Sequence, residues 1–213
     1  MSGAKPTAPD SPKVMVAMPT RGWPWVHSIL YAQRLATELG TGLAIGMGQP
    51  VTLMRNKLVR EFLKSDCTHL FFIDDDVVPP SGAVARLMAV NRPVATGLYP
   101  MSLQGRFVAS IRGLHDPDWA ETWPRDVFPI THCGLGCALI QREALERIGF
   151  PWFAWPEDEA GANVGEDVWF CRRVRKSGLQ IFCDGSVICG HIKGSFDPAS
   201  AWQARESAGL VEK

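Results

Sequence analysis

Residues 70–80 read Leu70-Phe71-Phe72-Ile73-Asp74-Asp75-Asp76-Val77-Val78-Pro79-Pro80. The apolar part is short, rich in aromatic residues and followed by turn-forming residues, which is typical of a buried central strand rather than a helix. Side chains alternate along a strand, so we expect Asp74 and Asp76 on one side and Asp75 on the other. Three adjacent carboxylates fit the carboxyl end of a strand in an open α/β sheet, where ligands bind.

The acidic triplet, residues 74–76, also suggests a site for a divalent cation. Carboxylate oxygens are hard ligands that suit Mg²⁺ or Mn²⁺. A cation would offset the repulsion between the neighbouring charges, which are costly to bury without partners. The alternative is a solvated acidic turn after an ordinary strand, and the triplet taken alone favours neither interpretation.

The composition is that of an ordinary globular chain. The 213 residues suffice for one substantial domain, with 46% hydrophobic and 21% charged residues. Lys and Arg total 22, as do Asp and Glu, so no basic excess points to nucleic acid or to an anionic membrane. No apolar run is long enough for a transmembrane segment, and the N-terminus lacks a secretory signal. We therefore expect a cytoplasmic protein with a disordered tail at residues 1–12.

The six cysteines are expected to be reduced, because nothing in the sequence indicates export. Several lie in apolar runs, where Cys acts as a small hydrophobic residue. Zinc could be imagined on Cys183, Cys189 and His191 together with Cys133 or Cys137. No CxxC pair supports such a site, and we do not favour it.

Strands and helices alternate through the first hundred residues. Strands are expected at 13–18, 41–47, 70–73 and 93–97, and helices at 25–39, 52–64 and 81–90. Thr52 and Ser81 are expected to cap their helices, and Leu53 to face the core. The alternation predicts an α/β fold with a doubly wound, mostly parallel central sheet and a smaller second sheet region. The sequence lacks GxGxxG after the first strand and lacks GxxxxGK[ST], which argues against Rossmann and P-loop folds.

The second half of the chain is less regular. Strands are expected at 107–112, 134–141, 179–183 and 187–191, and helices at 142–148, 165–177 and 199–208. Two long loops, 115–128 and 151–156, are rich in Trp and Pro. Their tryptophans either pack against the sheet or stack on sugars and bases, and these residues are Trp119, Trp123, Trp152 and Trp155.

A second acidic group, Glu166 and Asp167, lies in the first turn of an expected helix. Acidic residues at this position stabilise a helix through its dipole, and they can also supply a general base. One turn later, Arg172 or Arg173 could pair with a carboxylate or a phosphate. His191 ends an apolar strand, where a histidine is either a satisfied core residue or a metal ligand.

Six segments follow one another between residues 13 and 193: Pro19-Thr20-Arg21, Met54-Arg55-Asn56-Lys57-Leu58, Phe71-Phe72-Ile73-Asp74-Asp75-Asp76-Val77, Gly134-Leu135-Gly136-Cys137-Ala138-Leu139-Ile140, Gly165-Glu166-Asp167-Val168 and His191. Their order and spacing resemble the nucleotide-sugar-dependent glycosyltransferases of the GT-A fold, of the inverting family 2 type. The resemblance implies one GT-A-like domain over residues 13–213, with a nucleotide-binding half at 13–100 and an acceptor and catalytic half at 101–213. It also implies transfer of a sugar, as in hexosyltransferases, from a UDP-sugar to an acceptor hydroxyl, with Mn²⁺ or Mg²⁺ as cofactor.

The resemblance also implies residue roles at the diphosphate and at the acceptor. Asp74 and Asp76 match the DxD signature, in which the first carboxylate faces the ribose or the metal shell and the last one binds the metal together with His191. Asp167 matches the base that deprotonates the acceptor. Glu166 would contact the acceptor or the donor sugar.

The remaining implied positions bind the donor. The nucleoside pocket would be lined by Pro19, Thr20, Arg21, Arg55 and Asn56. Asp75 occupies the variable position of the acidic signature, and the strand containing Gly134 and Gly136 would lie beside the donor sugar.

Two rival functions and a rival mechanism remain open at the level of sequence. A nucleotidyltransferase using a nucleoside triphosphate would want a glycine-rich basic loop, and residues 19–23 supply only one arginine. A sugar- or nucleic-acid-binding module without catalysis would use the acidic residues structurally. A retaining mechanism uses similar motifs. The acceptor is equally open among a glycan, a lipid-linked sugar, a protein and a modified DNA base.

Overall fold

The computed structural model describes residues 12–103, 106–115, 118–158 and 161–192. The tail expected at residues 1–12 falls almost wholly outside these ranges, and the helix expected at 199–208 falls wholly outside them. In the described part of the chain, no helix is both long and apolar enough to cross a membrane. All six cysteines are buried and free.

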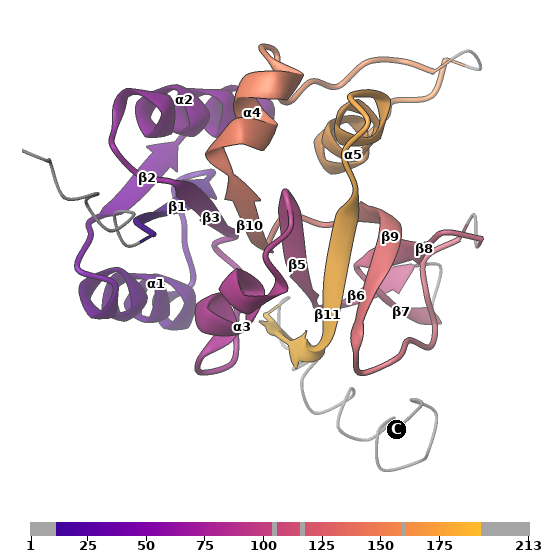
Figure 1. Cartoon of the computed structure of the whole chain (residues 1–213), viewed down its shortest axis with the longest axis horizontal. Helices are drawn as coiled ribbons and strands as arrows, with labels where there is room; N and C mark the ends of the chain where they lie inside the picture. The colour runs from indigo at the N-terminus through magenta and orange to yellow at the C-terminus, as the bar shows by residue number, and fades with distance from the viewer. Residues whose placement is uncertain (1–11, 104–105, 116–117, 159–160, 193–213) are drawn as a thin grey trace, which may run out of the picture.

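An eight-stranded mixed sheet forms the centre of the fold (Figure 1). Its order is β2 (Leu43–Met47), β1 (Val14–Thr20), β3 (His69–Ile73), β10 (Cys137–Gln141), β5 (Val94–Leu98), β11 (Ile181–Ile188), β9 (Val127–Cys133) and β8 (Ile111–Gly113). Strands β10 and β9 run antiparallel to both of their neighbours, and the other six share one direction. The expected α/β fold with a mostly parallel sheet is confirmed.

Two small ladders accompany the main sheet. Strand β4 (Val77–Val78) pairs with β12 (Gly190–His191), and β6 (Pro100–Leu103) pairs with β7 (Arg106–Ala109). The first of these ladders joins the residues just after the acidic triplet to a segment more than a hundred positions later in the chain. It therefore decides where His191 lies.

Within the described residues, five helices cover the two faces of the sheet. Figure 1 places α2, α4 and α5 on one face and α1 and α3 on the other. Their bounds are α1 Val26–Glu38, α2 Val51–Lys64, α3 Ala83–Val90, α4 Arg142–Ile148 and α5 Glu166–Lys176. Alternation along β3 sends Leu70 and Phe72 into the core beneath α2 and Phe71 and Ile73 into the core above α1 and α3. Both faces of the central strand are therefore buried, as its apolar sequence predicts.

Several local predictions are wrong. Pro50 is the N-cap residue of α2, so Thr52 lies inside the helix and does not cap it. Helix α3 begins after Gly82, whose φ of 76° lies in the left-handed region, and Ser81 makes no cap. Leu53 is 51% exposed, because α2 turns Leu58 and its neighbours toward the sheet instead.

The strand predictions also need correction in the second half. Residues 107–112 divide between β7 and β8, while the two strands expected at 179–191 form one long strand, β11, followed by β12. The loop expected at 115–128 ends in the first residues of β9. The turn residues Gly134–Gly136 precede β10 and are not part of it.

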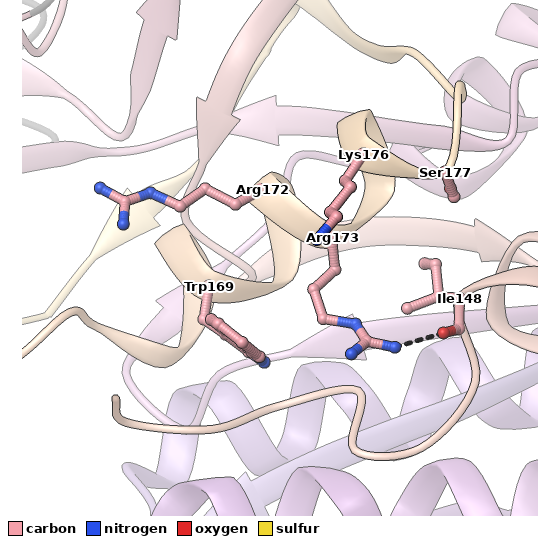
Figure 2. Close-up of a pocket in the computed structure, with 6 residues that line it drawn as sticks. All are labelled: Ile148, Trp169, Arg172, Arg173, Lys176 and Ser177. Carbon is pink, nitrogen blue, oxygen red and sulfur yellow. Dashed lines mark hydrogen bonds between the residues drawn. The ribbon is translucent and has the colours of Figure 1, made fainter. Parts of the chain in front are cut away.

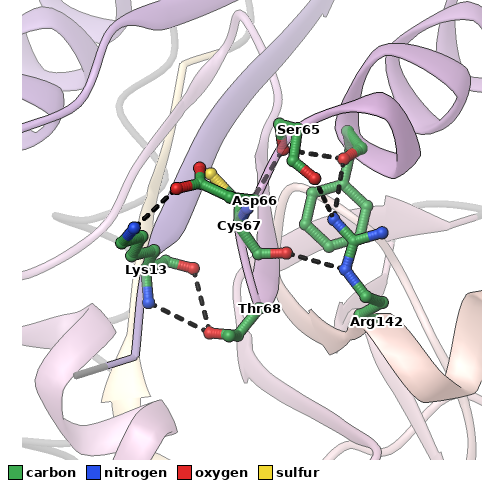
Figure 3. A network of polar contacts seen from close by, with 7 residues as sticks. Lys13, Ser65, Asp66, Cys67, Thr68 and Arg142 are labelled. Atoms are coloured by element: carbon green, nitrogen blue, oxygen red, sulfur yellow. Dashed lines mark hydrogen bonds and ion pairs between the residues drawn. The ribbon is translucent and has the colours of Figure 1, made fainter. Parts of the chain in front are cut away.

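Arg142, the first residue of α4, ties the sheet to the end of α2 (Figure 3). Its guanidinium donates hydrogen bonds to four carbonyl groups at distances of 2.8–3.2 Å, those of Phe62, Leu63, Ser65 and Cys67. The last carbonyls of a helix have no partner within the helix, so this side chain acts as a cap. Next to it, Lys13 pairs with Asp66 at 2.5 Å. The start of β3 is thus fixed at the end opposite the acidic triplet.

Candidate active site

A cavity of about 570 Å³ opens where β1 and β3 end. It is lined by Pro19, Thr20, Arg21, Trp23, Val51, Arg55, Asp74, Asp75, Asp76, Tyr99, Met101, Trp155, Glu166 and His191. Most of the site residues expected from the sequence are in this set. Among those expected, four are not lining residues: Asn56, Gly134, Gly136 and Asp167.

The acidic triplet is held by backbone hydrogen bonds from distant segments. The N–H of Trp25 donates to the carbonyl of Asp75 at 3.0 Å, and the N–H of Ile192 donates to that of Asp76 at 2.7 Å. Strand β3 ends at Ile73, so strand alternation does not extend into the triplet. The expectation that Asp75 faces away from the other two is wrong, because all three residues line the cavity.

Each carboxylate of the triplet has its own partner. Asp74 accepts a hydrogen bond from Arg55 at 2.7 Å, and Asp75 accepts one from the Thr20 hydroxyl at 2.5 Å. Asp76 lies 3.3 Å from His191. Burial is the main influence on both Asp74 and Asp75, and it raises the pKa of each carboxyl above its usual value.

The Asp76–His191 pair is built by the β12–β4 ladder, in which His191 lies opposite Val77. His191 is 4% exposed, and its Nδ1 lies 2.6 Å from the carbonyl oxygen of Pro100. A carbonyl can only accept, so Nδ1 carries a hydrogen. In the neutral imidazole, Nε2 then presents a lone pair toward Asp76, and the two acceptors need a proton or a cation between them.

This geometry suits a shared cation. Octahedral ligands with bonds of about 2.1 Å lie about 3.0 Å apart, close to the 3.3 Å between His191 Nε2 and Asp76 Oδ2. Within the described ranges, no group of three or more His, Cys, Asp or Glu side chains could hold a metal ion. Asp74, expected as a third ligand, is paired with Arg55 instead. The residues thus fit an ion held by two protein ligands and completed by substrate oxygens or water, as is common for Mg²⁺.

Arg55 pairs with carboxylates from both acidic groups of the site. It is 3% exposed on α2, and besides Asp74 it lies 3.6 Å from Glu166. Its guanidinium stacks over the ring of Phe72, 5.1 Å from the centroid. Burial opposes its charge, but Asp74 and Glu166 more than compensate, and the pKa of Arg55 is raised. Arg55 therefore stays cationic and joins the end of β3 to the start of α5.

The first turn of α5 supplies the second acidic group. Glu166 accepts a hydrogen bond from the indole N–H of Trp155 at 3.0 Å, and Asp167 accepts one from the backbone N–H of Val168 at 2.7 Å. Burial, reinforced by the charge of Glu166, raises the pKa of Asp167 to about 6. Such a carboxylate is mostly ionised at pH 7 and still basic enough to accept a proton.

Asn56 lies behind the cavity rather than in its lining. Its amide nitrogen donates to the carbonyl of Phe153 at 2.7 Å, and its amide oxygen accepts from the backbone N–H groups of Trp152 and Phe153. The side chain is 7% exposed. Asn56 thus holds the loop that leads to α5, a role that the sequence motif did not indicate.

The two glycines before β10 lie behind the triplet. A Cβ at Gly134 would meet the Tyr99 hydroxyl at 2.0 Å, and one at Gly136 would come within 3.1 Å of Asp74. The sequence interpretation placed these glycines beside the donor sugar. The contacts show that these glycines allow Tyr99 and Asp74 to approach the backbone closely, and their place beside the donor sugar stays a prediction.

Tyr99 is the main lining residue that the sequence interpretation missed. It directly follows β5, so the rule that ligands bind at the carboxyl ends of strands could have found it. Its ring contacts that of His191, with centroids 4.9 Å apart. Of the loop tryptophans, Trp155 lines the cavity, whereas Trp123 and Trp152 are buried and donate to backbone carbonyls.

Comparison with known proteins supports the fold. No protein-family model matches the chain, and no curated protein matches it. Among solved structures, the viral protein A197 from STIV is 23% identical with a TM-score of 0.65, covering 85% of this chain and 86% of that one. GalNAc-T7, solved with UDP, GalNAc and Mn²⁺, is 12% identical with a TM-score of 0.57, covering 87% of this chain and 45% of that one. The chain has a GT-A-like α/β fold.

Proposed function

We propose that the protein is a metal-dependent glycosyltransferase that moves a sugar from a UDP-sugar to an acceptor hydroxyl with inversion. The observation that carries the proposal is the meeting of Asp76 and His191 at a cavity also lined by Arg55, Asp74 and Glu166. GalNAc-T7, which shares the fold, is described with UDP, GalNAc and Mn²⁺, and this supports the choice of donor and ion.

The donor nucleotide is assigned to the end of β1. Pro19, Thr20 and Arg21 line the cavity there, and Thr20 is fixed by its hydrogen bond to Asp75. Arg21 is exposed and provides a cation for the diphosphate. Tyr99 supplies the floor beside His191.

Asp76 and His191 are the residues that would hold Mn²⁺ or Mg²⁺. When bound, the ion supplies positive charge that stabilises the departing diphosphate. The Pro100 carbonyl keeps His191 in the tautomer that presents Nε2 to the site. The charge of Arg55 offsets that of Asp74, which lowers the repulsion between the acidic residues of the site and an anionic donor.

Asp167 is the proposed base. It does not line the cavity itself, but it follows the lining residue Glu166, and the charges of Arg55 and Asp74 act on its pKa. The acceptor oxygen forms a bond to the anomeric carbon, the bond from that carbon to the diphosphate oxygen breaks, and the acceptor proton passes to Asp167. Glu166, fixed by Trp155 and Arg55, would orient the acceptor. The leaving diphosphate needs no proton, so one carboxylate base suffices, unlike the carboxylate pair of glycosidases.

Thermal unfolding with candidate ligands tests the proposal. Mn²⁺ plus UDP should raise the melting temperature, because a ligand at 100 times its Kd stabilises a protein by about 2.7 kcal/mol. Asp76→Asn should abolish this shift and the hydrolysis of UDP-sugars, whereas Glu61→Gln, an exposed change on α2, should preserve both. A larger shift with a nucleoside triphosphate than with UDP or UDP-sugars would favour a nucleotidyltransferase and contradict the proposal.

A further inference from the structure

A second cavity, of about 320 Å³, lies beside the C-terminal half of α5 (Figure 2). It is lined by Ile148, Trp169, Arg172, Arg173, Lys176 and Ser177. Figure 2 shows Arg172 and Arg173 leaving the helix in opposite directions, with Arg173 bonded to the carbonyl of Ile148. Arg172 and Lys176 are exposed and form no ion pair with any residue that the structure describes.

Two further basic side chains come from the sheet that α5 covers. Arg112 on β8 lies opposite His132 on β9, and α5 packs on β9 through the contact between Cys133 and Cys171. Burial and the charges of Arg112, Arg175 and Arg172 lower the pKa of His132 to about 4. Three arginines therefore contribute positive potential at His132.

Unpartnered polar atoms occur both on α5 and on strands β8 and β9. Of the six buried side-chain nitrogen and oxygen atoms without a partner in the described structure, three belong to Arg112, His132 and Trp169. Buried polar atoms normally have partners. The dipole of α5 accounts for cations in its last turn, but not for basic residues on β8 and β9 or for these unpaired nitrogens.

We infer that this surface binds the phosphate backbone of a single-stranded nucleic acid, which serves as the acceptor. The α5 basic face is defined as Arg112, His132, Trp169, Arg172, Arg175 and Lys176. The acceptor role rests on the proposed glycosyltransferase function. The binding itself does not.

The chemistry of the face favours nucleic acid over a membrane surface. Arginine predominates, and its planar guanidinium binds phosphate oxygens in pairs. Arg112 lies over the ring of Trp119, 4.4 Å from its centroid, and Trp169 borders the cavity, so aromatic rings lie beside the cations. Bases stack on such rings.

The position of the face also suits an acceptor strand. Arg172 and Lys176 follow Glu166 by six and ten residues on one helix, or roughly 9 and 15 Å at 1.5 Å per residue. A single strand of a few nucleotides covers this distance. A strand bound along α5 would thus bring one nucleotide to the acidic first turn.

Fluorescence anisotropy with a labelled single-stranded 12-mer, as DNA and as RNA, tests the inference. The double variant Arg172→Glu/Arg175→Glu should weaken binding at least tenfold and lower the slope of log K against log salt by roughly 0.7 per lost phosphate contact. The matched control Arg34→Glu/Lys64→Glu changes the net charge equally, and Lys64 also lies in the last turn of a helix. It should bind within twofold of the wild type.

Further measurements separate this inference from the proposed function. Both double variants should keep the thermal shift with Mn²⁺ and UDP. A wild type that binds the 12-mer but shows no such shift would refute the glycosyltransferase while supporting the binding face. No binding of the 12-mer, equal weakening in the control, or preference for phosphatidylserine vesicles would overturn the inference. The pKa of His132, followed by NMR, should rise when the 12-mer binds, and an unchanged value would also count against it.

Discussion

At the scale of single residues, the site depends on how buried charges are compensated. Arg55 is cationic because Asp74 and Glu166 lie beside it. A proton or a cation is needed between Asp76 and His191. Among the described residues, no basic side chain donates a hydrogen bond to Asp167, which accepts one from the backbone N–H of Val168. Its ionised form therefore costs free energy in the folded protein.

Asp167→Asn should stabilise the protein at neutral pH while abolishing transfer. The folded-state pKa of about 6 lies above the ordinary 3.8, so the folded state binds more protons between these values. The free energy of unfolding of the wild type therefore falls as pH rises through this window. Relative to the wild type, the variant should gain on the order of 1–3 kcal/mol between pH 4 and 7.

Urea unfolding at pH 4 and pH 7 measures this gain. Asp66→Asn is the control. The ion pair with Lys13 lowers the pKa of Asp66, so this variant should be less stable than the wild type at pH 7 rather than more stable. Equal stability of wild type and Asp167→Asn at pH 7 would show that Asp167 is not held as an unfavourable anion. The transferase rate of the wild type should rise with pH through about 6.

Gly134→Ala should destabilise the protein through Tyr99. The new Cβ would lie 2.0 Å from the tyrosine hydroxyl, and overpacking of this kind costs about 1–3 kcal/mol. Adding Tyr99→Phe should recover part of the loss, because it removes the closest atom. Gly42→Ala is the control, since a Cβ there meets no atom within 4 Å. Equal melting temperatures for Gly134→Ala and the wild type would contradict the packing described here.

At the scale of elements, the site is positioned by contacts between distant segments. The ladder of β12 and β4 places His191 beside the triplet. The ion pairs of Arg55 with Asp74 and Glu166 join the end of β3 to the start of α5. At the other end of β3, Arg142 closes α2 with four hydrogen bonds. The strand that bears the acidic triplet is thus fixed at both ends.

Arg142→Ala should cost about 2–4 kcal/mol of stability, because it removes charged hydrogen bonds and leaves helix carbonyls without partners. Arg142→Lys should cost less, although one ammonium group cannot satisfy all four carbonyls. Chemical denaturation of both variants checks the order. Arg34→Ala, at an exposed i,i+4 pair, should leave the midpoint unchanged. A loss for Arg142→Ala no greater than for Arg34→Ala would refute the capping role.

At the scale of the whole molecule, local chemistry was predictable and packing direction was not. The acidic triplet, Arg55 and His191 were found because their residue types and order carry the motif. Asn56 was assigned to the nucleoside pocket, but its amide bonds to the backbone of Trp152 and Phe153, because a motif does not say which way a side chain points after packing.

Helix faces show the same limit. In the helix expected at 25–39, Val26 and Leu30 lie at helical spacing with Leu35, yet they are 64% and 63% exposed. The buried face of α1 consists of Ser28, Ala32, Leu35 and Ala36, and three of these four side chains are small. Small residues let the helix lie close to the sheet, and a pattern of apolar residues alone does not predict which small residues do so.

The insertion of β10 between β3 and β5 also has a consequence for synthesis of the chain. During translation, the first hundred residues leave the ribosome without the strand that lies between β3 and β5. Residues 137–141 must follow before the sheet is complete. Until then, the exposed edges of β3 and β5 can pair with other nascent chains. By covering these edges, a strand from the second half of the chain protects the first half from misassembly.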